Sequence, residues 1–372
     1  MRVLHVFKTY WPETFGGIER TIDALCKHTA PFGVESEVFT LAQPGDWPPD
    51  KDGVPIVRAT RTVDIASTGF SLHAFSKFTG AARRADIVHY HFPWPFMDVL
   101  HMLARHGKPS LATYYSDIVK QQRLLTLYAP LMRAFLTSMD RIVATSEPHR
   151  RSSKVLRAFA DKVDVVPLGL AEEDYPQPSA AILERWRTRF PHPFVLFTGV
   201  FRYYKGLDTL IDAASQLDCD IVLLGDGPER TQLERKVRER ALHHVHFLGR
   251  LPDEDKMALL DLARALVLPS HLPSEAYGLS LVEAAMRGVP MICCEIGTGT
   301  SFVNIDGETG LVVPPVDPAR LATAIRTLIA DADLAHAMGS RARARYETEL
   351  TAQRLGERYA AIYTSIASKE IR

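Results

Sequence analysis

Cysteine and net charge are both scarce in this sequence, and each absence excludes a class of protein. The 372 residues include four cysteines, Cys26, Cys219, Cys293 and Cys294. Their spacing is neither a disulfide framework nor a zinc-ligand pattern, so we expect a reducing, cytoplasmic environment. Lys plus Arg number 44, as do Asp plus Glu. A chain without net charge gives no reason to expect a nucleic-acid partner.

Long apolar runs are also missing. No stretch of about 18 apolar residues occurs, so we expect no membrane-spanning helix. The opening apolar stretch, residues 2–7, is too short for the core of a signal peptide, and Lys8 follows it at once. These features predict a protein that remains in the cytoplasm.

What is present is an alternation of short apolar strands with helical segments. This alternation implies right-handed crossovers and mostly parallel sheets. The predicted fold class is therefore α/β, with two doubly wound, Rossmann-like domains. The expected strands are residues 3–7, 36–40, 87–90, 110–113, 142–144 and 163–166 in the first half and 194–198, 221–224, 245–248, 265–268 and 291–293 in the second.

The chain is longer than one hydrophobic core usually supports. The polar, proline-bearing segment 171–179 is the best candidate for a linker. We predict an N-terminal domain of residues 1–175 and a C-terminal domain of residues 176–354. Two such domains in series would place the carboxyl edges of their sheets opposite each other across a cleft, where a ligand can bind.

The most informative segment runs from Ser274 to Glu283 and reads Ser-Glu-Ala-Tyr-Gly-Leu-Ser-Leu-Val-Glu. An apolar strand precedes it and a Gly-Val-Pro helix stop follows it, which predicts a strand, a loop and a helix. The free N–H groups near Tyr277, Gly278 and Leu279 would then face the carboxyl edge of a parallel sheet and could bind a phosphate. Alternatively, the two glutamates only complement the helix dipole and line a solvated face.

This Glu-x7-Glu motif resembles that of the retaining glycosyltransferases of family 4, and the resemblance extends over nearly the whole chain. It implies the GT-B fold, in which two Rossmann-like domains face a central cleft. It also implies that Glu275 touches the donor sugar and that Glu283 binds the ribose of the nucleotide. GT-B proteins typically return their last helix to the first domain, so we expect residues from about 355 to 372 to pack there.

A second loop, Gly199–Gly206, follows the strand 194–198. Arg202 and Lys205 in this loop can neutralise a diphosphate leaving group. The family form has Arg directly after the first Gly, whereas this chain has Val200 there. We therefore expect Arg202 to take over that role. Taken in isolation, the loop could equally be a surface loop with two solvated cations.

The resemblance implies further contacts with the donor. Gly225 begins a glycine loop that matches the family in spacing, although a tight strand-to-helix turn would need the same residue. Gly249, Arg250 and Leu251 lie in the segment that resembles the backbone around the nucleotide base. Asn304 follows a later strand, where its amide could contact sugar or phosphate.

In the first domain, Gly16 and Gly17 precede a helix and can let the backbone approach a bound group closely. The resemblance implies that this loop faces the diphosphate and the acceptor. The loop is not Gly-x-Gly-x-x-Gly, so a nicotinamide dinucleotide site lacks its fingerprint here.

Many relatives place a His after the strand that here ends at Thr113, where it contacts the donor sugar. This chain has Tyr115 instead. A phenol can still bond a sugar hydroxyl, but it cannot replace an imidazole near pH 7. Asp117 and His91 are further candidates for contacts with sugar or acceptor. Their alternative roles are a helix cap and a structural histidine.

A basic and apolar patch is a further hypothesis. The segment 149–154, together with Arg83, Arg84 and Lys77 beside Phe75 and Phe78, could face a membrane. The expected location is therefore cytoplasmic, or peripheral at the inner face of the cell membrane. A solvated, charged helix would explain the same residues.

The sequence thus predicts a retaining, metal-independent hexosyltransferase with a nucleotide-sugar co-substrate and no other cofactor. The opening segment 6–13 with residues 16–19, the loop 202–206 and the segment 296–302 resemble those of bacterial enzymes that build O-antigens with mannose or D-rhamnose from GDP-linked donors. A GDP-sugar and a saccharide acceptor, which can be lipid-linked, are the expected partners. A UDP-sugar donor, a sugar-nucleotide epimerase and a non-catalytic nucleotide-sugar-binding subunit remain open as alternatives.

Overall fold

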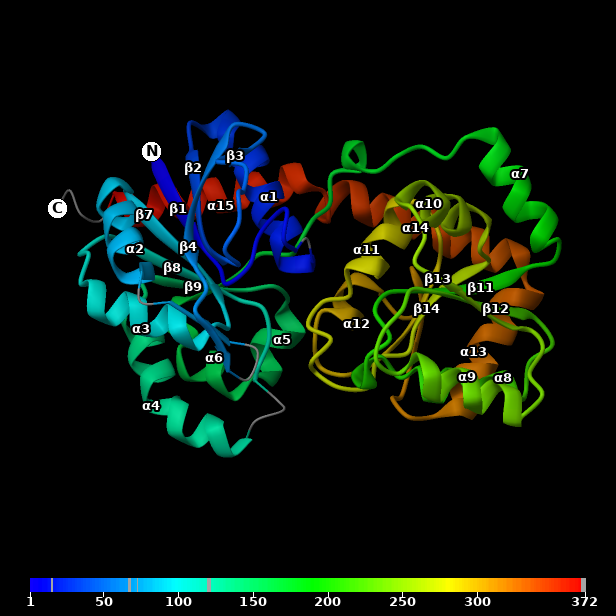
Figure 1. Ribbon diagram of the computed structural model, residues 1–372. Helices are drawn as coiled ribbons and strands as arrows, with labels where there is room; N and C mark the ends of the chain where they lie inside the picture. The colour runs from blue at the N-terminus through cyan, green and yellow to red at the C-terminus, as the bar shows by residue number, and fades with distance from the viewer. Residues whose placement is uncertain (15, 66–67, 72, 119–121, 369–372) are drawn as a thin grey trace. The chain divides into compact units, whose positions relative to one another are not determined.

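The computed structural model describes residues 1–372 except 15, 66–67, 72, 119–121 and 369–372. The chain divides into two compact units (Figure 1). Unit 1 comprises residues 1–169 together with 352–372, and unit 2 comprises residues 170–351. The sequence-based boundaries, after residues 175 and 354, differ from this division by a few residues.

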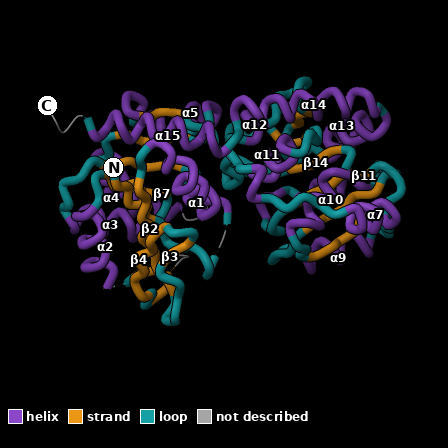
Figure 2. The backbone as a smooth tube through the Cα atoms, turned by 90° about the horizontal axis from the view of Figure 1, so that it is seen from above, coloured by secondary structure: helices purple, strands orange, loops and turns teal. Residues whose placement is uncertain are grey.

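Unit 1 is built on an eight-stranded sheet with the order β10, β9, β8, β7, β1, β2, β4, β3. Figure 2 labels β7, β2, β4 and β3 of this sheet. Neighbouring strands are parallel except for the short β3, which pairs with β4 antiparallel. The central strand β7 is buried along its whole length, as in parallel sheets that helices cover on both faces. The strands are Arg2–Val6 (β1), Glu35–Ala42 (β2), Asp50–Lys51 (β3), Val54–Thr60 (β4), Ile87–Phe92 (β7), Ser110–Tyr114 (β8), Arg141–Ala144 (β9) and Val163–Val165 (β10), with a separate hairpin of Val63–Ile65 (β5) and Thr68–Phe70 (β6).

The helices of unit 1 come from both ends of the chain. The last helix, α15, packs beside α1 (Figure 1). The approach is so close that a Cβ atom on Gly356 would lie 2.2 Å from the carbonyl oxygen of His28. The helices are Gly17–Thr29 (α1), His73–Arg84 (α2), Pro95–Ala104 (α3), Gln122–Ser138 (α4), Glu147–Ser152 (α5), Lys154–Ala158 (α6) and Ala352–Ala367 (α15), with 3-10 turns at Ala30–Phe32 and Ala160–Lys162.

Unit 2 contains a six-stranded, all-parallel sheet with the order β13, β12, β11, β14, β15, β16. The strand order reverses between β11 and β14, so the switch point lies between these two neighbours. The strands are Phe194–Thr198 (β11), Asp220–Leu224 (β12), Val245–Gly249 (β13), Ala265–Leu268 (β14), Met291–Cys294 (β15) and Gly310–Val313 (β16). The helices are Ala180–Arg189 (α7), Leu207–Ala214 (α8), Arg230–Glu239 (α9), Asp253–Leu262 (α10), Leu279–Met286 (α11), Thr300–Val303 (α12), Pro318–Ala330 (α13) and Ala332–Glu349 (α14), with 3-10 turns at Glu172–Asp174 (η3) and Tyr203–Lys205 (η4).

The predicted fold class is confirmed, since both units are α/β with mainly parallel sheets. Each strand expected from the sequence is present, with ends that shift by one or two residues. The sequence analysis missed β3, β4, β5, β6 and β16. The predicted linker is anchored within unit 2, because Ala171 and Tyr175 are buried. The end of the predicted last helix, residues 369–372, lies outside the described residues.

Two expectations about membranes can be compared with the structure. Among the described residues, no helix is both long and apolar enough to cross a bilayer. The predicted basic and apolar patch is wrong in its composition. Phe78 is fully buried in the core of unit 1, Phe75 packs against that core, and His149 is 2% exposed. These rings therefore belong to the core of unit 1 and are not available to form an apolar surface.

Candidate functional site

The loops after β11 and β14 meet at the switch point of the unit 2 sheet. Ligands of open parallel sheets bind outside the carboxyl ends of the strands at such a point. The loop after β11 carries Arg202 and Lys205, and the loop after β14 carries Glu275. A backbone bond from the N–H of His271 to the carbonyl of Tyr204 (3.0 Å) joins the two loops. The sequence-predicted residues of these loops are therefore brought together.

Gly206 explains how the two loops come so close. It has a left-handed φ of 68° and caps the N-terminus of α8. A Cβ atom there would lie 2.0 Å from the carbonyl oxygen of Pro269, so only glycine fits. Phe201, which is fully buried, packs against Phe197 and anchors the other side of the loop.

Glu275 is held from three sides. Its carboxylate pairs with the Lys205 ammonium and accepts a hydrogen bond from Ser270 Oγ (3.1 Å). Its backbone carbonyl accepts from Thr298 Oγ1 (2.7 Å). Glu275 is 8% exposed, so this ion pair lies in a largely desolvated place, where electrostatic interactions are stronger than in water. The acid and the base predicted to handle the donor thus form one preorganised pair.

Helix α11 begins beside this pair, as the sequence predicts. Gly278 is its N-cap with a left-handed φ of 81°, and Leu279 is its first residue. No acidic side chain occupies the first turn, so the positive end of the helix is available to an anion. Tyr277 is 3% exposed and packs directly on Gly299, where a Cβ atom would lie 2.4 Å from its ring. This packing fixes the entry to the helix.

Glu283, the predicted ribose ligand, is 9% exposed and has two partners that the sequence analysis missed. Tyr175 donates its hydroxyl to Oε1 (3.1 Å), and Lys256 Nζ lies 2.9 Å from the same oxygen. The Lys256 ammonium also lies over the Tyr175 ring, 5.1 Å from its centroid. Both partners hold the Glu283 carboxylate in place before any ligand arrives.

The other predicted donor residues of unit 2 fall into two groups. Arg202 and Arg250 are exposed, and Leu251 is half-buried. Gly225 and Gly249 are structural neighbours, since the N–H of Gly225 donates to the Gly249 carbonyl (2.8 Å). A Cβ atom on Gly225 would lie 1.9 Å from the Gly199 carbonyl oxygen. The predicted tight turn at Gly225 is therefore present, whatever it contributes to binding.

The suggested ligand contact of Asn304 is wrong. Asn304 is fully buried. Its amide nitrogen donates to the carbonyls of Met291 (3.2 Å) and Leu311 (3.0 Å), and its oxygen accepts from Thr309 Oγ1 (3.0 Å). These bonds tie β15 to β16 and use the amide completely. The sequence could not show this, because β16 had not been recognised.

In unit 1, Gly16 and Gly17 are exposed at the start of α1, as predicted. Glu19 organises the loop before them, because its Oε1 accepts from both Thr9 Oγ1 and Thr14 Oγ1 (2.8 Å each). The carboxylate is 7% exposed and sits in the first turn of α1. The sequence analysis did not identify this role of Glu19. This end of α1 therefore already carries a negative charge, unlike the start of α11.

Tyr115 lies directly after β8, at the carboxyl edge of the unit 1 sheet, and is 4% exposed. Its hydroxyl is 2.8 Å from His91 Nδ1, and the two rings stack with centroids 5.8 Å apart. Burial raises the pKa of the Tyr115 phenol well above its usual value, so it keeps its proton. The phenol is thus already bonded inside unit 1.

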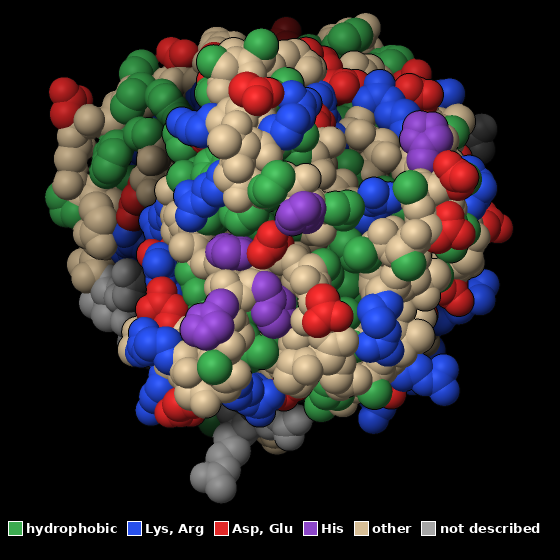
Figure 3. Space-filling model, turned by 90° about the vertical axis from the view of Figure 1, so that its right-hand side faces the viewer, with side chains coloured by type: hydrophobic (Ala, Val, Ile, Leu, Met, Phe, Trp, Pro, Cys, Tyr) green, Lys and Arg blue, Asp and Glu red, His purple; other side chains and the backbone are tan. Residues whose placement is uncertain are grey.

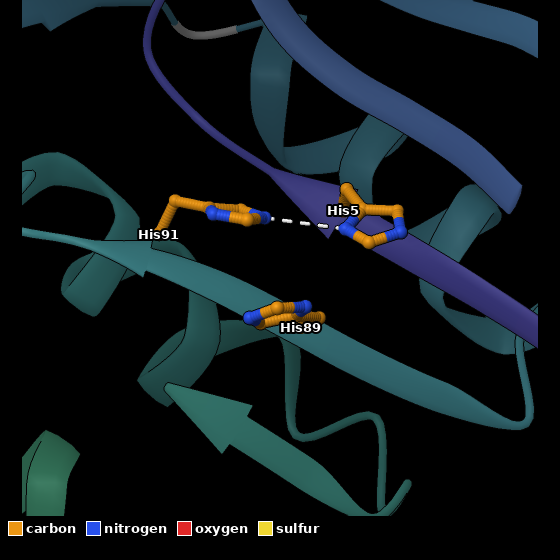
Figure 4. A group of neighbouring side chains, drawn as sticks. All are labelled: His5, His89 and His91. Atoms are coloured by element: carbon orange, nitrogen blue, oxygen red, sulfur yellow. Dashed lines mark hydrogen bonds between the residues drawn. The ribbon is translucent and has the colours of Figure 1, made fainter. Parts of the chain in front are cut away.

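His91 belongs to a cluster with His5 and His89, all fully buried (Figure 4). His5 Nδ1 and His91 Nε2 are 3.2 Å apart, and the His89 ring stacks on His91 at 4.2 Å. Burial lowers the pKa of His5 to about 3 and the pKa values of the other two well below 6.5. All three imidazoles are therefore neutral at pH 7. His5 was not recognised from the sequence.

Three imidazoles so close could in principle bind a metal ion. Every ring nitrogen, however, already has a partner. His89 bonds Tyr363 and Thr113 (2.7 Å each), and His5 Nε2 is 3.5 Å from Ser36 Oγ. One ring nitrogen from each histidine lies within 4.8 Å of the others, yet these nitrogens are used in the hydrogen bonds just named. The arrangement fits a hydrogen-bonded chain better than a tetrahedral site. The expectation of a metal-independent enzyme stays a prediction.

Asp117, the other candidate in this region, also has internal partners. Its Oδ1 accepts hydrogen bonds from the hydroxyls of Tyr114 and Ser153 (2.8 Å each). The latter contact ties the end of β8 to the start of α6. The residues that follow Asp117 include 119–121, outside the described residues, so its predicted helix-capping alternative stays untested.

Two cavities lie away from the predicted donor residues. One of about 480 Å³ is in unit 2 and is lined in part by His192, Arg264 and His336. The other, of about 330 Å³, is in unit 1 and is lined in part by Trp47 and Arg58. On the face drawn in Figure 3, Lys and Arg side chains are interspersed with Asp and Glu, as the zero net charge of the chain suggests.

Comparisons with known proteins agree with this geometry. Two family models match the chain: Glycosyltransferase Family 4 over residues 15–174, and Glycosyl transferases group 1 over residues 182–345. The D-rhamnosyltransferase WbpZ of Pseudomonas aeruginosa is 50% identical over 95% of this chain and 93% of its own length. The O-antigen chain mannosyltransferase C of Escherichia coli is 43% identical over 98% of this chain and 99% of its own length.

Solved structures share the fold at lower identity. Sucrose-phosphate synthase from Thermosynechococcus elongatus superposes with a TM-score of 0.82 at 22% identity and covers 99% of both chains. Anabaena HepE in complex with UDP-glucose gives a TM-score of 0.78 at 18% identity, covering 98% of this chain and all of that one. At such identities the likeness concerns the arrangement of helices and strands alone.

Proposed function

Since this chain belongs to glycosyltransferase family 4 and its two Rossmann-like units have the GT-B architecture, we propose that it transfers a mannose-type or D-rhamnose-type sugar from a GDP-sugar to a saccharide hydroxyl. We infer that the acceptor is a growing O-antigen or a related lipid-linked saccharide. The name of the E. coli relative, an O-antigen chain mannosyltransferase, supports this acceptor.

The observation that carries the proposal is the Lys205–Glu275 pair at the start of α11. When the bond between the sugar carbon and the phosphate oxygen breaks, negative charge grows on the leaving diphosphate. In this proposal the Lys205 ammonium and the N-terminal end of α11 stabilise that charge. Arg202 is exposed on the same loop and can move onto the phosphates when the donor binds. One such fixed donor is typically worth about 3 kcal/mol, or ~100-fold in rate.

The proposed reaction retains the anomeric configuration and needs no metal. In this scheme the sugar passes through an oxocarbenium-like state, and the acceptor oxygen forms its bond on the face that the phosphate leaves. The departing phosphate oxygen takes the acceptor proton, so no protein base is required. Glu275 stabilises the positive charge on the sugar, and Lys205 compensates the phosphate, which is work that a metal ion would otherwise do.

Titration calorimetry with GDP, UDP, ADP and NAD tests the nucleotide half of this proposal. We expect selective binding of GDP, weakened at least ~10-fold in Lys205→Met because one charge-assisted contact is lost. Arg235→Met, at an exposed position on α9 of the same unit, is the matched control and should bind GDP normally. Selective UDP binding would replace the donor, and binding of NAD alone would refute the transferase.

A second experiment tests transfer itself. Glu275→Ala should fold normally and bind GDP, yet transfer sugar at least ~100-fold more slowly. Near-normal transfer in Glu275→Ala would remove this residue from the site. Release of an altered free sugar without any acceptor would indicate an epimerase. The stereochemistry of the product, read by NMR of the anomeric proton, decides between retention and inversion.

A further inference from the structure

The cavity of about 480 Å³ in unit 2 lies at the opposite edge of the sheet from the predicted donor site. Its lining includes residues 190–193, 261–264 and 288–290. These segments directly precede β11, β14 and β15, which are neighbours in the parallel sheet. The predicted donor residues Lys205 and Glu275 instead follow β11 and β14. The cavity therefore lies at the amino ends of the strands and is separate from the donor site.

Positive charge predominates among the charged side chains that line this cavity. They are three guanidinium groups and one carboxylate, namely Arg187, Arg264, Arg287 and Asp261. The carboxylate is neutralised, because Arg287 donates to both oxygens of Asp261 at 2.6 Å. Arg187 pairs with Glu184 in the same helix, but both side chains are more than half exposed, and such surface pairs contribute little. The charge left over in the cavity is therefore positive.

Arg264 is the cation of this cavity that has no partner. The residue is half-buried, and its side chain makes no hydrogen bond, ion pair or ring contact within the part of the chain that the structure describes. Its backbone is fixed, since the Arg264 N–H donates to the Phe194 carbonyl (2.8 Å). A charged group that loses water without gaining a partner costs free energy. An anion in the cavity would remove that cost.

Two imidazoles add hydrogen-bond donors to the cavity. His192 stands before β11 and His336 lies in α14, and both line the cavity. Both side chains are exposed, and neither has a hydrogen-bond partner among the described residues. A neutral imidazole carries one N–H, so each ring can donate to an oxyanion without being charged. A phosphate monoester has three acceptor oxygens, which match an arginine fork and two imidazoles better than the two oxygens of a carboxylate do.

The size of the cavity and its apolar wall indicate a ligand larger than a phosphate ion. About 480 Å³ lies within the range of small-molecule sites, which is roughly 300–1,000 Å³. The wall also includes Phe190, Leu262, Val289 and three prolines. Phe190 is 5% exposed, and its ring stacks on that of Trp186 with the two planes 5° apart. This part of the wall is therefore formed before a ligand binds.

We propose that this cavity is a second ligand site, which binds a small phosphate ester with the phosphate on Arg264 and the organic part against the apolar wall. A sugar phosphate and a nucleoside monophosphate both have that chemistry. The inference does not depend on the proposed function, because the cavity and the donor site lie at opposite ends of the same strands. Both sites can therefore be occupied at the same time.

Titration calorimetry with inorganic phosphate, mannose 6-phosphate and AMP tests this site, with and without saturating GDP. At least one ester should bind more tightly than inorganic phosphate and with a Kd below ~1 mM, the upper end of usual substrate affinities. Arg264→Met should weaken that binding at least ~10-fold, because a charge-assisted contact is lost. Arg264→Lys keeps the charge without the fork and should give an intermediate affinity. Arg238→Met changes an exposed arginine of α9, outside the cavity, and should bind the ester normally.

Four results would overturn the inference. They are no ester binding at ~1 mM, inorganic phosphate binding as tightly as both esters, an affinity that Arg264→Met leaves unchanged, and displacement of the ester by GDP, which would place it in the donor site. Arg264→Lys provides the same comparison if Arg264→Met does not fold. Failure of the protein to bind GDP would overturn the proposed donor alone, because the titrations without GDP still compare the wild type with both Arg264 variants.

Discussion

Acidification should destabilise unit 1 through its buried histidines. His5, His89 and His91 are fully buried, and burial lowers the pKa of His5 to about 3 and the pKa values of the other two well below 6.5. In the unfolded chain each imidazole has a pKa of about 6.5. Between these values the unfolded state binds more protons than the folded state. The free energy of unfolding therefore falls as the pH falls below about 6.5.

The magnitude follows from these pKa directions. For one such histidine, lowering the pH from 7.5 to 5.5 costs about 1.4 kcal/mol, since only the unfolded imidazole becomes protonated. The three groups together cost about 4 kcal/mol, a large part of a typical stability of roughly 5–15 kcal/mol. His101 and His106, whose pKa values burial lowers to about 4, act in the same direction.

Hydrogen exchange read by mass spectrometry can measure this effect in each unit separately. After correction for intrinsic exchange rates, peptides from β7 and β8 should show an opening free energy at least about 4 kcal/mol lower at pH 5.5 than at pH 7.5. Peptides from β11 and β12 are the internal control. The histidines of unit 2 are exposed or half-buried, so its opening free energy should change much less.

Two variants sharpen the test. His89→Gln replaces one titrating group by an amide that can still bond a hydroxyl, so the loss of opening free energy in β7 between pH 7.5 and pH 5.5 should shrink by about 1.4 kcal/mol. His73→Asn removes an exposed histidine of the same unit and should leave the pH dependence unchanged. Equal opening free energies for β7 at both pH values would refute the reasoning, since the buried imidazoles would then have to be protonated or solvated in the folded state.

Three further changes should act on unit 2. Gly206→Ala should lower the free energy of unfolding by about 2–4 kcal/mol, because the added Cβ would collide with the neighbouring backbone. Gly307 has a similar φ but open space around it, so Gly307→Ala should lower the free energy of unfolding by only about 1 kcal/mol. Urea unfolding of the two variants measures both values. Lys256→Met should weaken nucleotide binding in calorimetry, because Glu283 loses a partner, and Lys256→Arg should largely preserve it. Asn304→Asp should cost at least about 3 kcal/mol in urea unfolding by burying a charge beside carbonyl oxygens, and a normal stability would show that Asn304 is solvated.

Local patterns predicted the elements well because they need only local information. An apolar run such as Ala265–Leu268 is recognisable as a buried strand, and the sequence gives its two ends correctly. Gly278 and Leu279 stand where a helix start was expected, since a left-handed glycine before apolar residues is a local signal. The missed strand β16 lacks such a signal, because it is only four residues long and follows a turn.

Partners far apart in the chain were beyond the reach of this reasoning. Tyr175 and Lys256 lie 108 and 27 residues from Glu283, and nothing in their own segments indicates the contact. His5 and His91 are 86 residues apart and meet because β1 and β7 are neighbours in the sheet. The register of neighbouring strands determines which of their side chains come into contact, and the register depends on the packing of the whole unit. The alternation of strands and helices in the sequence does not predict the register.

The same limit applies to the direction of Tyr115. The sequence identifies the residue that replaces the family histidine, and it allows the phenol to face a sugar. Which way the hydroxyl points depends on the buried neighbour His91, which lies on a different strand. A substitution at a known position can therefore be recognised from the sequence, while its chemical consequence depends on the side chains around it.

In the predicted donor site of unit 2, the carboxylates Glu275 and Glu283 are more preorganised than the cations Lys205 and Arg202. Glu275 and Glu283 already have their partners, so binding a nucleotide sugar costs little ordering of these carboxylates. Because Lys205 already pairs with Glu275, its charge is shared between Glu275 and an incoming diphosphate, which weakens its interaction with the diphosphate. Arg202, exposed and on a loop that Phe201 anchors, can add the charge that Lys205 cannot give in full. On the proposed function, an arginine two residues beyond the family position would suffice, since it need only reach the diphosphate after the donor has docked.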